Sequence, residues 1–290
     1  MFVSNRNIIF SILGVLALAN FLAWNIVFDL SSRNFLEVNF FDISQGDAIF
    51  IETPSKHQIL IDGGPDSTIL EKLSKEMPFW DRSIDLIILT HPERDHLVGL
   101  IEVLKKYQVE NILWTGIIRD TAEYKEWLEL IRKEKAGIKI VKSGQKITMS
   151  PGLAVMEILY PLENLEDRKF KDSNNTSIVA KLVFGQNSFL FTGDIYKSVE
   201  KDFLDKMVDV NSNVLKVAHH GSKTSSSEEF IKEVSPEIAI ISVGKGNSYG
   251  HPHKEVLDIL TKYGIKILRT DENGDIKIIS DGKNYALPHF

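Results

Sequence analysis

One long apolar segment opens the chain, and short apolar runs fill the rest. Residues 8–28 (IIFSILGVLALANFLAWNIVF) contain no charged side chain over 21 positions, which is long enough to cross a bilayer as a helix. Arg6 precedes this segment and Asp29 follows it, a charge order that favours placing the remaining chain outside the cytoplasm. We therefore expect residues 1–30 to anchor an extracytoplasmic domain to a membrane.

Two other interpretations of this segment stay open. A cleaved signal peptide would use Arg6 as its basic start, residues 8–16 as its apolar core and residues 17–19 (ALA) as its cleavage site. A buried core helix is the second, although the segment is apolar on all sides rather than on one face. Because apolar sequence continues to Phe28, the uncleaved anchor is favoured.

Residues 31–290 alternate between strand-like and helix-like patterns. Strands are predicted at 34–43, 47–53, 57–64, 83–90, 154–159, 176–185, 188–193, 213–218, 237–244 and 265–270. Helices are predicted at 96–108, 121–136, 198–208, 226–234 and 253–264. This mixture predicts an α/β domain with two sheets, or one large mixed sheet, covered by helices. No Pro/Gly/Ser-rich linker divides it, so we expect one domain over 31–290.

Composition narrows the chemistry. The chain has 290 residues, a net charge of -6 and a pI near 5.8, so it lacks the basic field of a typical nucleic-acid binder. It contains no cysteine, which excludes disulfides, thiolate ligands and cysteine nucleophiles. Any metal must therefore be held by nitrogen and oxygen atoms.

Metal-capable side chains gather where four predicted strands end, and six of the eight histidines lie in three of these turns. Imidazoles and carboxylates aimed at one point from strand ends are what a divalent metal requires. The candidates are His91, Glu93, Asp95 and His96; Asp194; His219 and His220; and His251 and His253.

Each candidate also has a purely structural interpretation. His91 could be a surface histidine, Asp95 a helix N-cap and Asp194 a turn residue. The pair His219 and His220 could belong to a polar loop, and His251 could simply precede a proline at a helix start. The ordered combination of all four turns argues against these interpretations jointly.

The order of motifs resembles a known family. The segments FDISQGDAIFIETPSKHQILIDGG, THPERDHLVGL, NNTSIVAKLVFGQNSFLFTGD, VLKVAHHGSKTSSS, ISVGKGNSYGHPHKEVLDIL and ILRTDENGDIKI look like the metallo-β-lactamase-fold domain of ComEC-type competence proteins over residues 35–280. The resemblance implies a four-layer αββα sandwich with a metal site along one edge of the two sheets. Such proteins also carry a many-helix membrane channel, so a separate channel-forming competence protein is an expected partner.

The resemblance also implies a ligand set. The family's first motif is H-x-H-x-D-H, and Glu93 stands here in place of the second histidine. One metal site would then comprise His91, Glu93 and Asp194. The other would comprise Asp95, His96, Asp194 and a histidine of the 219–220 pair, of which we favour His220.

The change to Glu93 bears on the metal. A charged oxygen ligand favours Mn²⁺ over Zn²⁺ or weakens that site, so we expect one or two Zn²⁺ or Mn²⁺ ions. Residues 174–176 (NNT) occupy the region where many relatives have a further histidine.

Roles follow from the same resemblance. A metal-activated water is the nucleophile, oriented by Asp194 and Asp95. His251, Ser222, Lys223 and Ser225 are expected to contact a substrate oxyanion, whereas His253 is expected to start a helix. Asp62 is expected to hold a ligand histidine from behind, as carboxylates commonly do in metal sites.

Phosphodiester hydrolysis, specifically of DNA near the cell surface, is the activity that the resemblance implies. The acidic net charge stands against a DNA substrate. Hydrolysis of a small surface phosphoester, such as a phosphocholine-type ester, is one alternative. A membrane-tethered binding domain that lost turnover through the change at Glu93 is another.

Overall fold

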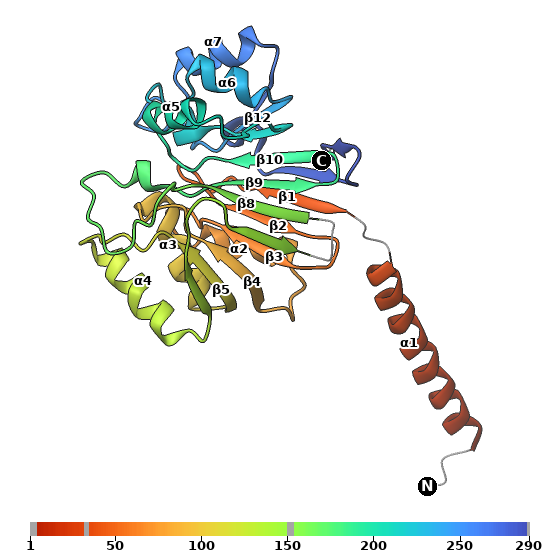
Figure 1. Cartoon of the computed structure of the whole chain (residues 1–290). Helices are drawn as coiled ribbons and strands as arrows, with labels where there is room; N and C mark the ends of the chain where they lie inside the picture. The colour runs from red at the N-terminus through yellow and green to blue at the C-terminus, as the bar shows by residue number, and fades with distance from the viewer. Residues whose placement is uncertain (1–4, 32–34, 150–153, 289–290) are drawn as a thin grey trace. The chain divides into compact units, whose positions relative to one another are not determined.

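The computed structural model describes residues 5–31, 35–149 and 154–288, and it separates into two compact units between residues 35 and 36. In the first unit, helix α1 spans Asn5–Ser31. Its segment Arg6–Trp24 has a mean hydropathy of 1.9 and is not buried, so α1 is a candidate membrane span (Figure 1). The anchor, signal-peptide and core-helix interpretations of this segment all remain predictions.

The second unit contains two sheets of eight and seven strands. The first sheet has the order β15-β14-β1-β2-β3-β4-β5-β6. Its strands are β1 (Leu36–Phe40), β2 (Ile49–Glu52), β3 (Gln58–Ile61), β4 (Ser83–Ile88), β5 (Gln108–Trp114), β6 (Gly137–Ile140), β14 (Ile276–Ser280) and β15 (Tyr285–Ala286).

The second sheet has the order β13-β12-β11-β10-β9-β8-β7. Its strands are β7 (Lys146–Met149), β8 (Ala154–Tyr160), β9 (Val179–Phe184), β10 (Asn187–Phe191), β11 (Val214–Lys216), β12 (Ile238–Ile241) and β13 (Lys266–Arg269). The ten predicted strands are all present. Strands β5, β6, β7, β14 and β15 were not predicted.

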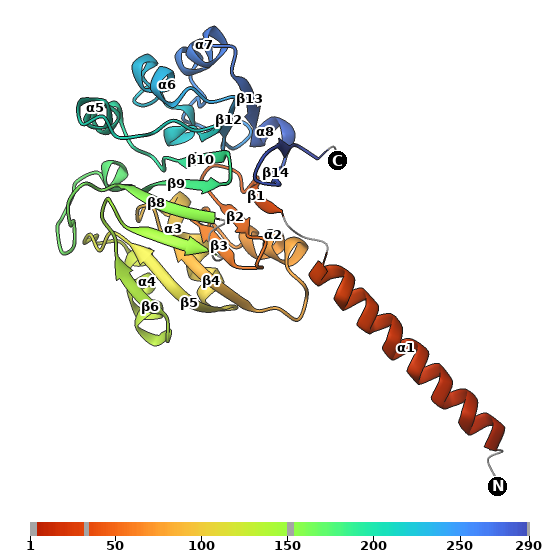
Figure 2. The same cartoon turned by 45° about the vertical axis from the view of Figure 1, so that its right-hand side comes forward.

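Helices cover the outer face of each sheet (Figure 2). On the first sheet lie α2 (Thr68–Glu76), α3 (Arg94–Leu104) and α4 (Ala122–Lys133), and on the second lie α5 (Lys197–Asp205), α6 (Glu228–Val234) and α7 (Lys254–Lys262). Shorter helical segments are α8 (Thr270–Asn273), η1 (Asn174–Thr176) and η2 (Ala218–Gly221). This arrangement confirms the predicted αββα sandwich.

The second half of strand β4 shows why its sequence is apolar. Leu86 and Ile88 face the core between the sheets, whereas Ile87 faces the core beneath the helices. A strand segment buried on both faces has no solvent-facing positions to fill with polar residues. The apolar run 86–89 therefore ends only where β4 leaves the sheet, at the turn that holds His91.

Strand direction gives the first sheet two distinct ends. Strands β3, β4, β5 and β6 are parallel, and β1 runs the same way because β2 is antiparallel to both β1 and β3. We call the end where these five strands begin the amino end, and the opposite one the carboxyl end. The chain joins the sheet at the amino end with Leu36, and all the first-sheet metal candidates follow strands at the carboxyl end.

Candidate metal centre

Four predicted ligands meet where the carboxyl end of the first sheet lies beside the ends of β10 and β11 in the second sheet. Asp95 and His96 lie in the first turn of α3, Asp194 follows β10, and His220 lies in η2 after β11. One ligand atom from each lies within 4.8 Å of the others. Parallel strands carry successive turns to the same sheet end, so residues far apart in sequence converge here.

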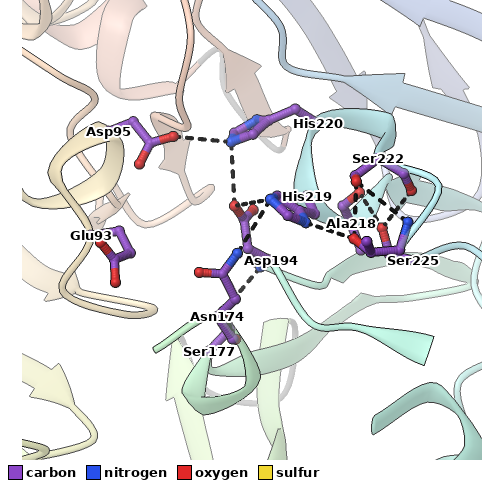
Figure 3. A network of polar contacts seen from close by, with 12 residues as sticks. Glu93, Asp95, Asn174, Ser177, Asp194, Ala218, His219, His220, Ser222 and Ser225 are labelled. Atoms are coloured by element: carbon purple, nitrogen blue, oxygen red, sulfur yellow. Dashed lines mark hydrogen bonds and ion pairs between the residues drawn. The ribbon is translucent and has the colours of Figure 1, made fainter. Parts of the chain in front are cut away.

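Asp194 is the centre of this group. Its Oδ2 lies 3.4 Å from Nε2 of His96 and 3.4 Å from Nε2 of His220. Asp95 completes the group, because its Oδ2 lies 3.4 Å from the same His220 nitrogen (Figure 3). A carboxylate between two imidazoles is positioned to share a cation with both.

The side chains that face this point lack the partners that burial normally requires. Among the described residues, the Nε2 atoms of His91, His96 and His220 and the Oδ1 atom of Asp194 are buried without a hydrogen-bond partner. Buried polar atoms are rarely left unsatisfied. Three imidazole nitrogens and a carboxylate oxygen are also suitable ligands for a divalent metal, so the residues fit such an ion.

Each converging imidazole is fixed through its other nitrogen. His96 Nδ1 lies 2.8 Å from Oδ2 of Asp62, and His220 Nδ1 lies 2.8 Å from the Ser242 carbonyl oxygen. Asp62 also accepts hydrogen bonds from the Thr90 amide at 2.8 Å and the Thr90 hydroxyl at 2.6 Å. This is the contact that the supporting role expected of Asp62 requires, and it leaves each Nε2 free to face the cluster.

The two adjacent histidines, His219 and His220, differ in their position relative to the group of four. His220 belongs to the group of four, whereas His219 Nε2 lies 4.0 Å from Asp194 and 3.3 Å from the side-chain amide of Asn174. Both histidines have left-handed backbone conformations, with φ of 51° and 54°. This geometry favours His220 as the ligand and leaves His219 as its neighbour.

Glu93 lies outside the group of four, so the expected site of His91, Glu93 and Asp194 stays a prediction. Its Oε1 pairs with the Arg119 guanidinium at 2.6 Å and accepts a short hydrogen bond from the Ser173 hydroxyl. Figure 3 shows the Glu93 side chain with no contact to Asp95 or Asp194. A carboxylate already neutralised by a guanidinium has little reason to bind a metal as well.

A buried ion pair behind the ligands was not predicted. The Lys216 ammonium is fully buried and forms an ion pair with Asp47, and it lies 3.7 Å from Oδ1 of Asp194. Asp47 Oδ1 in turn lies 3.6 Å from Nδ1 of His220. Gly46, which precedes Asp47, lies against the backbone of Asp95: a Cβ on it would lie 2.1 Å from the Asp95 carbonyl oxygen. Lys216 therefore supplies a fixed positive charge beside the carboxylates.

The charges within the cluster shift its pKa values strongly. Burial lowers the pKa of His220, but the adjacent Asp194 carboxylate outweighs it and raises that pKa to about 10. His96 behaves alike: burial opposes its charge, yet Asp194, Asp62 and Asp95 raise its pKa well above the usual value. Burial raises the pKa of Asp194, but His220 and His96 reverse this and hold it well below its usual range. The carboxylates thus stabilise positive charge at the point where the ligands converge.

A cleft of about 170 Å³ opens onto the cluster. Besides Asp95, Asp194 and His220, the cleft is lined by Gln45, His91, Glu93, Asn174, His219, Tyr249 and His251. His251 is half-buried, and burial followed by the neighbouring histidines lowers its pKa to about 4. Of the expected substrate contacts, His251 alone lines the cleft; Gln45 and Tyr249 were missed, since neither carries a distinctive motif.

The other three expected substrate contacts do not line this cleft. Ser225 is buried and donates to backbone carbonyls of Ala218 and Ser222 within its own loop. The Ser222 hydroxyl pairs with Thr224 at 2.9 Å. Lys223 is exposed. Their substrate role stays a prediction.

The structural alternatives for single candidates are also resolved. The N-cap position of α3 is Glu93, not Asp95, and His91 is 1% exposed rather than a surface residue. His253 occupies the N-cap position of α7, in agreement with its expected place at a helix start. Pro252 precedes that position, so His251 does not adjoin the first helical turn.

Comparison with known proteins agrees with this geometry. Residues 42–245 match the family model described as the metallo-beta-lactamase superfamily. The chain therefore belongs to the metallo-β-lactamase superfamily. Solved structures agree in fold: the metallo-beta-lactamase fold protein YhfI from Bacillus subtilis superposes with a TM-score of 0.59 at 13% identity, covering 86% of this chain and all of that one.

Within the superfamily, the domain is of the ComEC competence type. It is 33% identical to ComE operon protein 3 of Bacillus subtilis over 83% of this chain and 32% of that protein. It is 31% identical to competence protein ComA of Neisseria gonorrhoeae over 91% of this chain and 35% of that protein. The chain thus spans about a third of the length of the curated relatives that it matches.

Proposed function

We propose that this chain is a metal-dependent phosphodiesterase that hydrolyses DNA on the outer side of a membrane to which α1 anchors it. The observation that carries the proposal is the convergence of two buried, unpartnered imidazole Nε2 atoms, those of His96 and His220, with the Asp194 carboxylate. The resemblance to ComEC-type competence proteins, which these relatives support, favours DNA as the substrate class. A separate channel-forming competence protein remains a proposed partner.

The group of four would hold the ion, and the His91 ring lies beside that of His96, with ring centroids 4.2 Å apart. When bound, a divalent ion of the Zn²⁺ or Mn²⁺ type acidifies water and polarises a phosphoryl oxygen. Asp95 is only partly buried, so its carboxylate can accept a hydrogen bond from a water at the edge of the cluster and orient it.

The open side of the cleft offers groups for the substrate. Because its pKa is about 4, His251 is neutral at pH 7, and its buried Nδ1 has no partner among the described residues. A neutral imidazole can donate one hydrogen bond to a phosphate oxygen. Tyr249 is 65% exposed and stacks on His251 with ring centroids 5.6 Å apart, which provides an aromatic platform for a base.

The first test measures metal content and hydrolysis together. The purified full-length chain is analysed by mass spectrometry for Zn and Mn, and assayed on bis-p-nitrophenyl phosphate and single-stranded DNA with each ion added. Asp194→Asn should lose bound metal and lower turnover by on the order of 10²-fold or more, since even supporting residues of metal sites cost 10–100-fold. His57→Ala, a histidine outside the cleft, is the matched control and should change neither.

The second test distinguishes DNA from a small phosphoester. Tyr249→Ala should raise the KM for single-stranded DNA, because stacking of one base contributes about 1–3 kcal/mol, and leave hydrolysis of bis-p-nitrophenyl phosphate unchanged. Equal effects on both substrates would favour the small-phosphoester alternative. A folded chain with bound metal but no turnover on either substrate would favour the tethered binding domain.

A further inference from the structure

An aromatic pair projects from the amino end of the first sheet, away from the metal centre. Phe79 and Trp80 lie in the connection between α2 and β4 and are 81% and 73% exposed. Their rings contact each other edge to face, with centroids 4.8 Å apart. In the rest of the second unit, large apolar side chains are mostly buried in three cores, so two adjacent exposed aromatic rings call for a partner.

The strand directions show that this pair lies at the same end of the first sheet as the start of β1. Strand β4 begins at Ser83, three residues after Trp80, and β4 is parallel to β3. Strand β1 begins at Leu36 at that same amino end. The candidate membrane span therefore joins the domain at the end of the sheet from which Phe79 and Trp80 project.

We infer that the Phe79–Trp80 pair inserts into the bilayer interface and docks the domain on the membrane by the amino end of its first sheet. Tryptophan and phenylalanine bury apolar area at the level of lipid headgroups, and tryptophan is enriched there. Arg82 adds a cation beside them, held over the Tyr107 ring at 5.3 Å. The inference depends on α1 as a membrane span and not on the catalytic activity.

Docking in this way would orient the metal centre. The ligands lie at the carboxyl end, and the six residues of β4 alone separate the two ends by about 20 Å at a rise of 3.3 Å per residue. The cleft would then face the aqueous phase, where a soluble polymer can reach it. A second attachment besides α1 would also limit the orientations of the domain relative to the membrane.

Spin labelling of the full chain tests the inference, and the absence of native cysteine makes each label unique. The chain is reconstituted into phosphatidylcholine–phosphatidylglycerol vesicles with a nitroxide at Phe79→Cys or, as the control, at the 89% exposed Met207→Cys. We expect collisions with oxygen to exceed those with an aqueous nickel chelate several-fold at position 79 and the reverse at position 207. Equal, water-like accessibility at both positions would overturn the inference.

A second pair of samples separates docking from simple tethering. A nitroxide at Lys106→Cys, on the same end of the sheet, is compared with and without the double change Phe79→Ser and Trp80→Ser. Because both aromatic side chains are exposed, the double variant should fold normally, which circular dichroism and bound metal would verify. We expect the label to become water-accessible in the double variant; an unchanged signal would contradict docking by the aromatic pair. Phosphodiesterase activity in detergent is measured separately and does not depend on either outcome.

Discussion

The two sides of the metal-binding cleft differ in how their charged groups are used. On the His220 side, Asp95 and Asp194 face imidazole nitrogens that lack other partners, and Lys216 with Asp47 supports them from behind. On the Glu93 side, the carboxylate forms an ion pair with Arg119 and accepts a hydrogen bond from the Ser173 hydroxyl. The same type of side chain thus serves as a candidate ligand on one side and as a structural ion pair on the other, and its neighbours decide which.

Removing Lys216 should produce the largest effect, because it tests the support of the His220 side. Lys216→Met leaves Asp47 buried without its cation, and breaking a buried pair in this way costs about 3–5 kcal/mol of unfolding free energy. Urea denaturation of the full chain would measure the loss. The double variant Lys216→Met with Asp47→Asn should recover part of it, and no recovery would mean that the pair itself is not the cause.

The pH dependence of the unfolding free energy should report the protonation of His220, on the same side of the cleft. With a chelator present, His220 has a folded pKa of about 10 against an ordinary value near 6.5, so its contribution to stability is complete below pH 6.5. Because the folded state then holds the extra proton, the unfolding free energy should fall as pH rises from 6.5 to 10. Urea titrations across this window would measure the change, and His220→Gln should reduce it, leaving the contribution of His96, whose pKa is also raised.

Bound metal should oppose the fall of the unfolding free energy with rising pH, because a ligand imidazole must release its proton before it binds the ion. Metal affinity is therefore expected to rise over the same pH range. An unfolding free energy that is flat in chelator and unchanged by His220→Gln would contradict the assignment of the shifted pKa to this residue.

The smallest effect is expected on the Glu93 side. Glu93→Gln should leave metal content unchanged and lower the unfolding free energy by at most about 1 kcal/mol, since the pair with Arg119 is partly exposed to solvent. Metal analysis beside the matched Asp95→Asn variant would sharpen the contrast, because that variant should lose metal. A fall from two bound ions to one in Glu93→Gln would instead make Glu93 a ligand.

The sequence predicted which residues form the site better than it predicted the contacts between them. Strand ends and the start of α3 follow from local apolar patterns, which is why Asp95, His96, Asp194 and His220 could be named in advance. Strand β5 was not predicted, because Glu110 and Asn111 interrupt its apolar pattern. It lies next to the edge strand β6. Local patterns thus identify where a strand ends, but not which strand lies beside it.

Pairings between distant residues left no local signal. Lys216 reads as an ordinary polar residue in the run VLKVA, and only the packing of both sheets brings it to Asp47. Glu93 likewise meets Arg119 through a turn 26 residues later. Ser225 could not be distinguished from a substrate contact, because the direction of its hydroxyl depends on how the loop folds back on Ala218.

The left-handed backbone at His219 and His220 has a thermodynamic consequence. Non-glycine residues in this conformation cost on the order of 1–3 kcal/mol each and persist only where their surroundings impose it. The turn η2 therefore holds its imidazole in a conformation that an isolated peptide of the same sequence would rarely adopt. Any ion that binds His220 favours this conformation by mass action, so folding of the turn and occupancy of the site are linked equilibria.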